Sequence, residues 1–371
     1  LAALPAPKAD VWKPVDEIPF PPPFHVIPPP PRLPDEQAEG LFRGDYPARI
    51  SVVLPAANES VMLKRTVDQF VATLPSDSQV IVVDNESDAT ALEAFSARFP
   101  WVQFIANPVN SGFGAGCNIG VESATGEQLL FMNPDVIASV RSIRALIDIK
   151  ARHTIGIVAP KQVSTGGKPQ KVFDDFPSLL NQSKTLKSLL RILMPARFPD
   201  PRADYTEVTY CDWVTGSVLL IDRADYDAIG GWSEDYWMYV EDADLCRKAQ
   251  DKGLTVAYVP EVQVIHAHGG SSRINVAVKS MTKLEVIISK HVYTRRHTAG
   301  LERWLTHALI VVLRLPVLVL ASILDWVTLR QIATLRVRSS MLVGLSTYYL
   351  GVLRSGSWLS PRAIANQAPS A

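Results

Sequence analysis

Three acidic residues stand inside an aromatic and apolar run that extends from Tyr236 to Cys246. They are Glu241, Asp242 and Asp244. A buried carboxylate is costly unless it is paired or has a chemical role. Capping the helix expected just after this point is the alternative use, but Asp244 alone supplies the charge that a first turn needs. The run is therefore a candidate catalytic site that could remove or deliver a proton.

A second acidic site follows the apolar run 128–132, where Asn133, Pro134 and Asp135 stand in sequence. Carboxylates at the ends of hydrophobic strands are a common way to hold a divalent metal and a phosphate group. The alternative for Asp135 is a carboxylate that only stabilises a turn. Together the two acidic sites predict an enzyme that acts on a nucleotide-linked substrate.

Two further residues stand at strand ends, and each has a functional and a structural interpretation. Asp84 ends an apolar strand and precedes Asn85. Its carboxylate could accept a hydrogen bond from the imide of a pyrimidine base, or it could cap the following turn. His266 closes a short strand, where it could serve as a metal ligand or as a structural histidine.

A glycine-rich segment covers residues 112–120. Its spacing is G-x-G-x-G-x-x-x-G, and the polar loop 107–111 separates it from the preceding strand. The dinucleotide fingerprint needs G-x-G-x-x-G directly after a strand, so a nicotinamide-dependent dehydrogenase is disfavoured. The segment instead predicts close approach of the backbone to a ligand at the start of a helix.

The elements that position these residues alternate between strands and helices. Strands are expected at 49–54, 79–84, 102–106 and 128–132, with helices at 60–74, 89–99 and 114–124. Such alternation predicts an α/β fold whose mainly parallel sheet is covered on both faces. Ligands of these sheets bind beyond the carboxyl ends of the strands. The polar residues at strand ends should therefore meet at one edge.

The second half of the chain is less regular. Strands are expected at 155–160, 214–222, 256–259 and 262–266, with a helix at 243–252. Residues 164–208 read as an irregular insertion that contains one basic helix at 179–193. Cys117, Cys211 and Cys246 form no C-x-x-C pair, which favours a reducing compartment over a disulfide framework or a zinc site.

The two ends of the 371-residue chain differ in composition from its centre. Residues 1–47 hold 13 of the 28 prolines and predict an extended arm that could contact the body, a partner or nothing. From residue 273 onward 13 basic and 3 acidic residues give a net charge of +10. A basic, apolar tail favours an anionic membrane surface as partner over nucleic acid, although a solvated basic helix face would look similar.

Residues 305–327 form an apolar stretch that would extend about 34 Å as a helix, enough to cross a bilayer. Yet Arg303, His307, Arg314 and Asp325 project within about 40° of each other around that helix. One polar stripe on a broad apolar surface favours a helix that lies in the membrane interface over a span. A buried dimer interface is the remaining alternative.

Seven motifs in this order resemble those of a family 2 inverting glycosyltransferase with the GT-A fold. They are Ser51-Val-Val-Leu-Pro, Val82-Val-Asp-Asn-Glu-Ser, Asn110-Ser-Gly-Phe-Gly-Ala-Gly-Cys-Asn-Ile-Gly, Asn133-Pro-Asp, Gly230-Gly-Trp, Tyr239-Val-Glu-Asp-Ala-Asp-Leu-Cys and Val264-Ile-His-Ala-His-Gly-Gly-Ser-Ser. The resemblance covers residues 49–272. Two of these motifs, the fourth (Asn-Pro-Asp) and the sixth (with Glu-Asp-x-Asp-Leu-Cys), are similar to those of the rhamnosyltransferase-like branch.

The resemblance implies a role for each matching residue. Asp242 would be the general base, and Asp135 with His266 would hold Mg²⁺ or Mn²⁺ on the donor diphosphate. The nucleotide would contact Pro55, Ala57, Asn58, Glu59, Asp84, Asn85, Asn110, Gly112, Asn118 and Asn133. The donor sugar and acceptor would contact Trp213, Gly216, Trp232 and Glu241.

The resemblance also implies an activity and a location. The enzyme would move a sugar, with L-rhamnose from dTDP-rhamnose as first candidate, to a lipid-linked or cell-surface glycan. Galactofuranose, another hexose or an N-acetylhexosamine remain open as the sugar, and a non-catalytic membrane-docking module remains as a different class of function. We expect a Pro-rich arm (1–47), a catalytic domain (48–272) and a membrane-associating helical region (273–371).

This architecture predicts a peripheral or monotopic protein on the cytoplasmic face of the bacterial inner membrane. The Pro-rich arm offers a surface for a second copy or an assembly partner. A processive synthase is disfavoured because the chain lacks both a Gln-x-x-Arg-Trp motif and several full spans.

Overall fold

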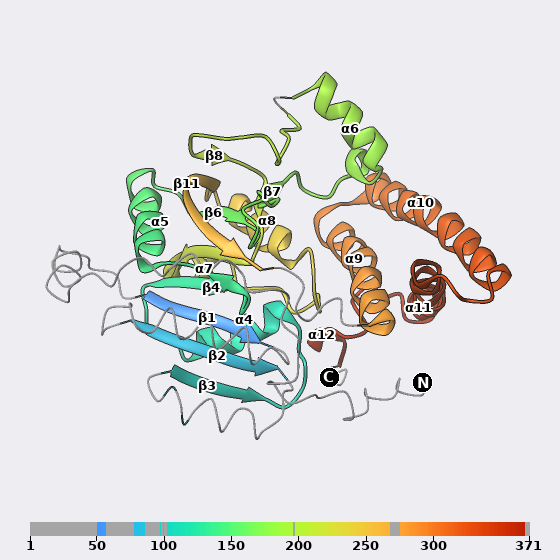
Figure 1. Ribbon diagram of the computed structural model, residues 1–371, viewed down its shortest axis with the longest axis horizontal. Helices are drawn as coiled ribbons and strands as arrows, with labels where there is room; N and C mark the ends of the chain where they lie inside the picture. Colours follow the sequence, from blue (N-terminus) through green and yellow to red (C-terminus); the bar gives the residue numbers. More distant parts are fainter. Residues whose placement is uncertain are drawn as a thin grey trace, which may run out of the picture. The chain divides into compact units, whose positions relative to one another are not determined.

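A nine-stranded sheet forms the centre of the computed structural model, which describes residues 50–56, 78–85, 97, 99, 102–195, 197–267 and 275–367. The strand order is β3-β2-β1-β4-β10-β6-β11-β5, with β8 paired to β11 (Figure 1). The strands are β1 (Ile50–Ala56), β2 (Gln79–Asn85), β3 (Val102–Asn107), β4 (Gln128–Met132), β5 (Val136–Ile137), β6 (Ile157–Val163), β8 (Thr209–Tyr210), β10 (Val218–Asp222) and β11 (Val256–His266).

Six of these nine strands run in one direction, namely β1 to β4, β6 and β11, while β5, β8 and β10 run against them. The predicted mainly parallel sheet is thereby confirmed. The two short closing strands expected at 256–259 and 262–266 are one strand, β11. Its pairing with β6 shifts between Val259 and Gln263, because Pro260 has no N–H to donate to the ladder.

Both faces of the sheet are buried, which explains why its central strands read as unbroken apolar runs. Alternate residues of β1 face opposite sides, so Val52 and Leu54 join one core cluster and Val53 joins the other. Helix α5 (Val140–Arg152) packs on the first cluster through Ile143 and Leu146. Helices α4 (Phe113–Glu122), α7 (Arg223–Ala228) and α8 (Glu241–Asp251) contribute residues to the second.

The insertion between β6 and β10 carries small elements at the rim of the sheet. Strands β7 (Phe173–Asp174) and β9 (Trp213–Val214) pair with each other. The expected basic helix consists of a short 3-10 helix, η3 (Leu179–Asn181), followed by α6 (Lys184–Leu193). The expected helix at 60–74, nearly all of that at 89–99 and the Pro-rich arm lie outside the described residues.

The C-terminal region folds into helices α9 (Val276–His297), α10 (Gly300–Val327), α11 (Ala333–Ser355) and α12 (Ile364–Gln367). The first three pack together beside the sheet (Figure 1). Their shared core contains Ile288, Ile310 and Leu345, and it also includes Tyr236 and Ala243 from the segment around the start of α8. The helical region and the candidate catalytic segment therefore share one hydrophobic core.

Helix α10 is the one helix of the described residues that is long and apolar enough to cross a membrane. Its polar stripe faces the protein, since His307 and Asp325 are buried and Arg314 lines a cavity. Its exposed side is apolar, as Val312, Leu320 and Trp326 illustrate. Length and composition are compatible with a span, and an inward polar stripe under an exposed apolar side is compatible with both a span and an interfacial helix.

Candidate active site

A cavity of about 640 Å³ opens at the carboxyl ends of the parallel strands, where ligands of α/β sheets bind. Eleven of the predicted site residues line it. They are Pro55, Asn85, Asn110, Gly112, Asn133, Asp135, Trp213, Gly216, Glu241, Asp242 and His266. Ala57, Asn58 and Glu59 lie outside the described residues. Residues more than 200 positions apart in sequence thus meet in one cavity.

The glycine-rich segment is held against the backbone at Trp237. The Phe113 N–H donates to the Trp237 carbonyl at 3.0 Å, and the Trp237 indole N–H donates to the Asn110 carbonyl at 3.1 Å. Gly112 has φ 89°, and a Cβ there would lie 1.9 Å from the Trp237 carbonyl oxygen. The close approach predicted for this glycine is therefore to the chain itself, and it ties the loop to the segment that leads into α8.

Asn85 binds the other side of the same loop. Its amide nitrogen donates to the Gly112 carbonyl at 3.1 Å. Its oxygen accepts from the Asn107 amide at 2.8 Å and from the Ser111 hydroxyl at 3.1 Å. The neighbouring Asp84 is buried at the end of β2 but is not among the described residues that line the cavity.

Asn118 and Trp232 were expected to contact the ligand, but among the described lining residues neither appears. The Asn118 amide donates to the Trp232 carbonyl at 3.0 Å and accepts from the Trp232 N–H at 3.0 Å. Trp232 is 2% exposed, and its ring packs edge-on against Phe113 at 5.3 Å and lies behind Gly216. Both residues support the cavity wall from behind, a role that sequence order alone cannot separate from direct contact.

Asp135 and His266 meet because β5 pairs with the end of β11, with Val136 opposite His266. The His266 Nε2 atom lies 3.2 Å from the Asp135 carboxylate. On the other side of the ring, Nδ1 lies 2.8 Å from Gln162 Oε1, which also accepts from the Ser217 hydroxyl. With Nδ1–H donated to Gln162, Nε2 is the ring nitrogen that faces the Asp135 carboxylate. An imidazole nitrogen and a carboxylate are ligand types that divalent cations accept.

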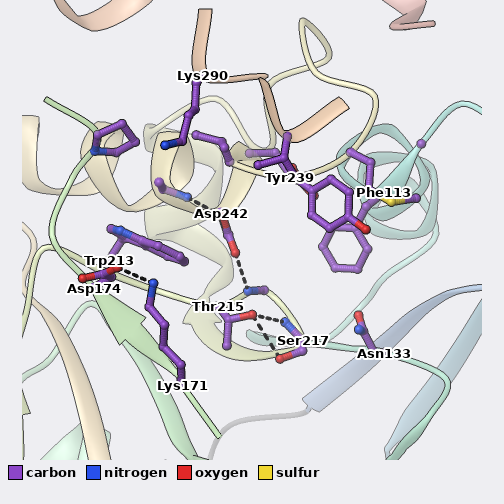
Figure 2. Close-up of a pocket in the computed structure, with 18 of the residues that line it drawn as sticks. Phe113, Asn133, Lys171, Asp174, Trp213, Thr215, Ser217, Tyr239, Asp242 and Lys290 are labelled. Carbon is purple, nitrogen blue, oxygen red and sulfur yellow. Dashed lines mark hydrogen bonds and ion pairs between the residues drawn. The ribbon is translucent and has the colours of Figure 1, made fainter. Parts of the chain in front are cut away.

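Asp242 lies in the first turn of α8, where the backbone makes a sharp entry. Tyr239 and Val240 have φ 70° and 69°, a left-handed conformation that costs free energy in residues other than glycine. One carboxylate oxygen of Asp242 accepts from the Ala243 N–H at 2.9 Å and the other from the Gly216 N–H at 3.3 Å. Figure 2 shows the side chain directed into the cavity between Trp213 and Thr215 on one side and Tyr239 on the other.

The two neighbouring carboxyl groups of this turn both have raised pKa values. Burial raises the pKa of Asp242 to about 6, and the N–H groups of Ala243 and Gly216 and the charge of Lys171 limit this rise. Burial raises the pKa of Glu241 well above its ordinary value, and the adjacent Asp242 raises it further. With a pKa of about 6, Asp242 is largely ionised at neutral pH and can accept a proton.

One end of the cavity is cationic, and sequence reasoning missed it. Its residues come from the insertion and from the C-terminal helices, and they are Lys171, Asp174, Asp175, Lys187, Lys290 and Arg314. The basic helix near 179–193 and Arg314, in the most apolar part of α10, were visible signals. Nothing in their spacing connected them to Asp242, since four separate segments bring them together.

The family model described as glycosyl transferase family 2 matches residues 51–199. A second, described as the N-terminal domain of galactosyltransferase, matches residues 202–268. The two matches follow one another along the chain and together cover the strands of the sheet. They end before the helical C-terminal region.

Among curated relatives, the N-acetylglucosaminyl-diphospho-decaprenol L-rhamnosyltransferase of Mycobacterium tuberculosis is 26% identical over 235 residues, which are 58% of this chain and 76% of the relative. The rhamnosyltransferase WbbL of Escherichia coli is 26% identical over 197 residues, or 51% and 72% of the two chains. Among solved structures, the mannosyltransferase PcManGT from Pyrobaculum calidifontis, in complex with GDP-Man and Mn²⁺, has a TM-score of 0.47 at 15% identity over 90% of this chain and 89% of that one.

The family match begins at β1 and extends past the strand ends that carry Asn85, Asn110 and Asp135, and the second match ends just beyond His266. Six of the seven motifs lie wholly inside the matched regions, and the seventh begins inside them. Residues 51–199 are thus a glycosyltransferase family 2 domain, and the chain is similar to relatives named as rhamnosyltransferases.

Proposed function

We propose that this enzyme transfers a sugar, with inversion, from a nucleoside diphosphate donor to a lipid-linked or cell-surface glycan. The observation that carries the proposal is an ionised carboxylate, Asp242, in the same cavity as the Asp135–His266 pair. The names of the two rhamnosyltransferase relatives make L-rhamnose from dTDP-rhamnose the first candidate donor sugar. Galactofuranose, another hexose and an N-acetylhexosamine are the alternatives.

The donor would bind on the side formed by Pro55, Asn133 and the glycine loop, with its diphosphate at Asp135. A carboxylate and an imidazole are suitable ligands for Mn²⁺ or Mg²⁺. Asp135 and His266 would hold the ion, which supplies charge neutralisation for the departing diphosphate. Gln162, which accepts from His266 Nδ1, would fix the ring so that Nε2 faces the ion.

Asp242 would remove the proton of the acceptor hydroxyl as that oxygen attacks the anomeric carbon. The new bond forms between the hydroxyl oxygen and the anomeric carbon, while the bond from that carbon to the diphosphate oxygen breaks. Attack from the face opposite the leaving group inverts the configuration in one step. The Gly216 and Ala243 N–H groups hold the carboxylate in place before the acceptor arrives.

The rate of transfer should fall at low pH. Because the base must be ionised, kcat/KM should rise with pH and reach half of its plateau near pH 6, the pKa to which burial raises Asp242. The measurement is initial rate against pH at low substrate concentration, with dTDP release as readout. A profile that stays flat from pH 5 to 8 would exclude Asp242 as the rate-controlling base.

Asp135→Ala should remove metal-dependent nucleotide binding. We expect the affinity for dTDP in the presence of Mn²⁺ to fall at least about 10-fold, while the weak binding in the presence of a chelator stays unchanged. Calorimetry gives both values. Asp204→Ala is the matched control, since the Asp204 side chain is 88% exposed and should change neither value. Equal dTDP affinity in wild type and Asp135→Ala would rule out this metal site.

The donor is identified by screening dTDP-, UDP- and GDP-sugars for nucleoside diphosphate release with a bacterial lipid extract as acceptor. Release from one donor names the sugar. Nucleotide binding without release indicates a missing acceptor, whereas no nucleotide binding at all favours the docking-module alternative. For location, we propose peripheral or monotopic attachment at the cytoplasmic face of the bacterial inner membrane, supported by the exposed apolar side of α10.

A further inference from the structure

The cationic cluster consists of Lys171, Lys187, Lys290 and Arg314, and all four residues line the active-site cavity. They lie on four separate segments, namely the strand-flanking loop before β7, α6, α9 and α10. Figure 2 shows Lys171 and Asp174 on one side of Asp242, with Asn133 on the other, and Lys290 entering from a third direction. The cluster is therefore separate from the side of the cavity that would hold the nucleotide.

The acidic residues around the cluster do not balance it. Asp174 pairs with Lys171, with Lys187 at 2.5 Å and with Arg191 at 2.9 Å. Asp175 pairs with Lys187 at 3.0 Å. Asp242 also feels the charge of Lys171. Three carboxylates thus face the four cations of the cluster and Arg191, and Asp174 and Asp175 are already paired with Lys171, Lys187 and Arg191.

Lys290 and Arg314 carry the remaining positive charge. Among the described residues, the Lys290 ammonium donates a hydrogen bond to a neutral amide oxygen, Gln182 Oε1, at 3.2 Å. Desolvation lowers the pKa of Lys290 to about 8, and repulsion from Arg314, Lys187 and Lys171 adds to this effect. Cations that are held together against their own repulsion, and open to a cavity, are suited to bind a multiply charged anion.

The surroundings of the cluster indicate that this anion is attached to a lipid. Helix α6 turns its cationic residues, Lys187 and Arg191, toward Asp174 and leaves its apolar side outside. Leu186, Leu189 and Ile192 are 38%, 49% and 77% exposed. A helix on a purely aqueous surface would turn its apolar side toward the protein and its charged side toward water. A helix at a membrane interface can expose its apolar side to the lipid, as α6 does.

Helix α10 continues this apolar surface from another part of the chain. Arg314 lines the cavity while Val312 and Val317, on either side of it in sequence, are 65% and 53% exposed. The short 3-10 helix η3, which precedes α6, contacts both α6 and α10. The cationic cluster is thus bordered by two helices whose outward sides suit acyl or isoprenoid chains.

We propose that the cationic cluster binds the phosphate or diphosphate group of a lipid-linked acceptor, whose lipid leaves the cavity over the apolar sides of α6 and α10. This inference rests on the proposed transfer to a lipid-linked glycan. Lys171 and Asp242 line the same cavity of about 640 Å³, so the saccharide between the anionic group and the reacting hydroxyl is short. The cluster therefore selects acceptors by their lipid phosphate and places the first sugars beside Asp242.

The test uses binding, so that it does not depend on turnover. The full chain is first saturated with dTDP and Mn²⁺, and farnesyl diphosphate, farnesol and inorganic diphosphate are then titrated in turn. We expect farnesyl diphosphate to bind at least 10-fold more tightly than either of the others and without displacing dTDP. Lys290→Gln and Arg314→Gln should each weaken the binding of farnesyl diphosphate at least 10-fold and leave dTDP affinity unchanged. The control is Arg338→Gln, a change at an exposed residue of α11, which should alter neither affinity.

Four outcomes would overturn the inference. Unchanged farnesyl diphosphate affinity in both variants would show that the cluster does not bind it. Displacement of dTDP would place the lipid diphosphate in the donor site, and equal affinity for inorganic diphosphate would show that the lipid plays no part. The fourth is a loss of binding to phosphatidylglycerol vesicles confined to Lys290→Gln and Arg314→Gln, which would assign the cluster to bilayer head groups; we expect equal vesicle binding in all variants.

Failure of dTDP, UDP and GDP alike to bind the wild-type chain would instead contradict the proposed function. If only UDP or GDP binds, that nucleotide replaces dTDP in the titrations.

Discussion

Replacing Asp242 by Asn should lower the turnover number by about 100- to 10,000-fold, the range typical for loss of a general base. The amide keeps the size of the side chain and one oxygen to accept the Gly216 or Ala243 N–H. It cannot take the proton of the acceptor hydroxyl. Because Asp135, His266 and the glycine loop are untouched, dTDP affinity should remain within about 2-fold of wild type. Stopped assays of dTDP release and calorimetry with dTDP measure the two quantities.

Glu241→Gln separates this prediction from a general effect on the turn. The Glu241 carboxyl is buried, and its Oε2 atom has no hydrogen-bond partner within the described residues. Burial raises the pKa of that carboxyl and so favours its uncharged form. The uncharged amide of Gln should therefore preserve most of the turnover and the fall in rate below about pH 6. If Glu241→Gln abolished transfer while Asp242→Asn retained it, the roles of the two residues would be exchanged.

The sheet and its strand-end residues were predictable because local signals specify them. The β-branched run at 79–84 can only be buried on both faces, and polar residues after such runs converge at one edge of a parallel sheet. Two of these residues, Asn110 and Asp135, do line one cavity, whereas Asp84 is buried and is not among the described residues that line it. The helix predicted at 243–252 is also present as α8, but it begins at Glu241 and not at residue 243.

What the sequence could not specify depends on packing between distant segments. Asn118 is as polar as Asn110, but the structure uses it to fasten Trp232 behind the wall. Gly112 fits against Trp237, 125 positions away, which no local pattern indicates. Lys290 and Arg314 reach the cavity only because α9 and α10 pack beside α8, and helical periodicity alone does not say which neighbour a polar stripe faces.

Asp244→Asn should have the largest effect on stability, because Asp244 joins the catalytic helix to the C-terminal helices. Its carboxylate is 0% exposed and accepts from Arg296 at 2.8 Å, from His297 at 2.7 Å and from the Tyr236 hydroxyl at 3.1 Å. Removing one partner of a buried ion pair typically costs about 3–5 kcal/mol. Arg296 is about one-third exposed, so water compensates part of this, and we expect the free energy of unfolding to fall by about 2–4 kcal/mol.

The same carboxylate gives this loss a pH signature. Burial alone would raise the pKa of Asp244, but the His297 hydrogen bond and the charges of Arg296 and Lys248 hold it below its ordinary value. A lowered carboxyl pKa contributes stability above the unfolded-state value near 4, and that stability is lost as the pH falls below it. Urea unfolding should therefore separate wild type from Asp244→Asn at pH 7 and bring them together in acid.

Asp251→Asn is the matched control on the same helix. Asp251 also pairs with an arginine, Arg247 at 2.9 Å, but its side chain is 54% exposed. Loss of an exposed pair of this kind should change the free energy of unfolding by less than about 1 kcal/mol. Equal effects of the two substitutions would mean that Asp244 does not join the two regions. A large effect of Asp244→Asn alone would mean that the helix carrying Asp242 is positioned by the same helices that supply Lys290 and Arg314.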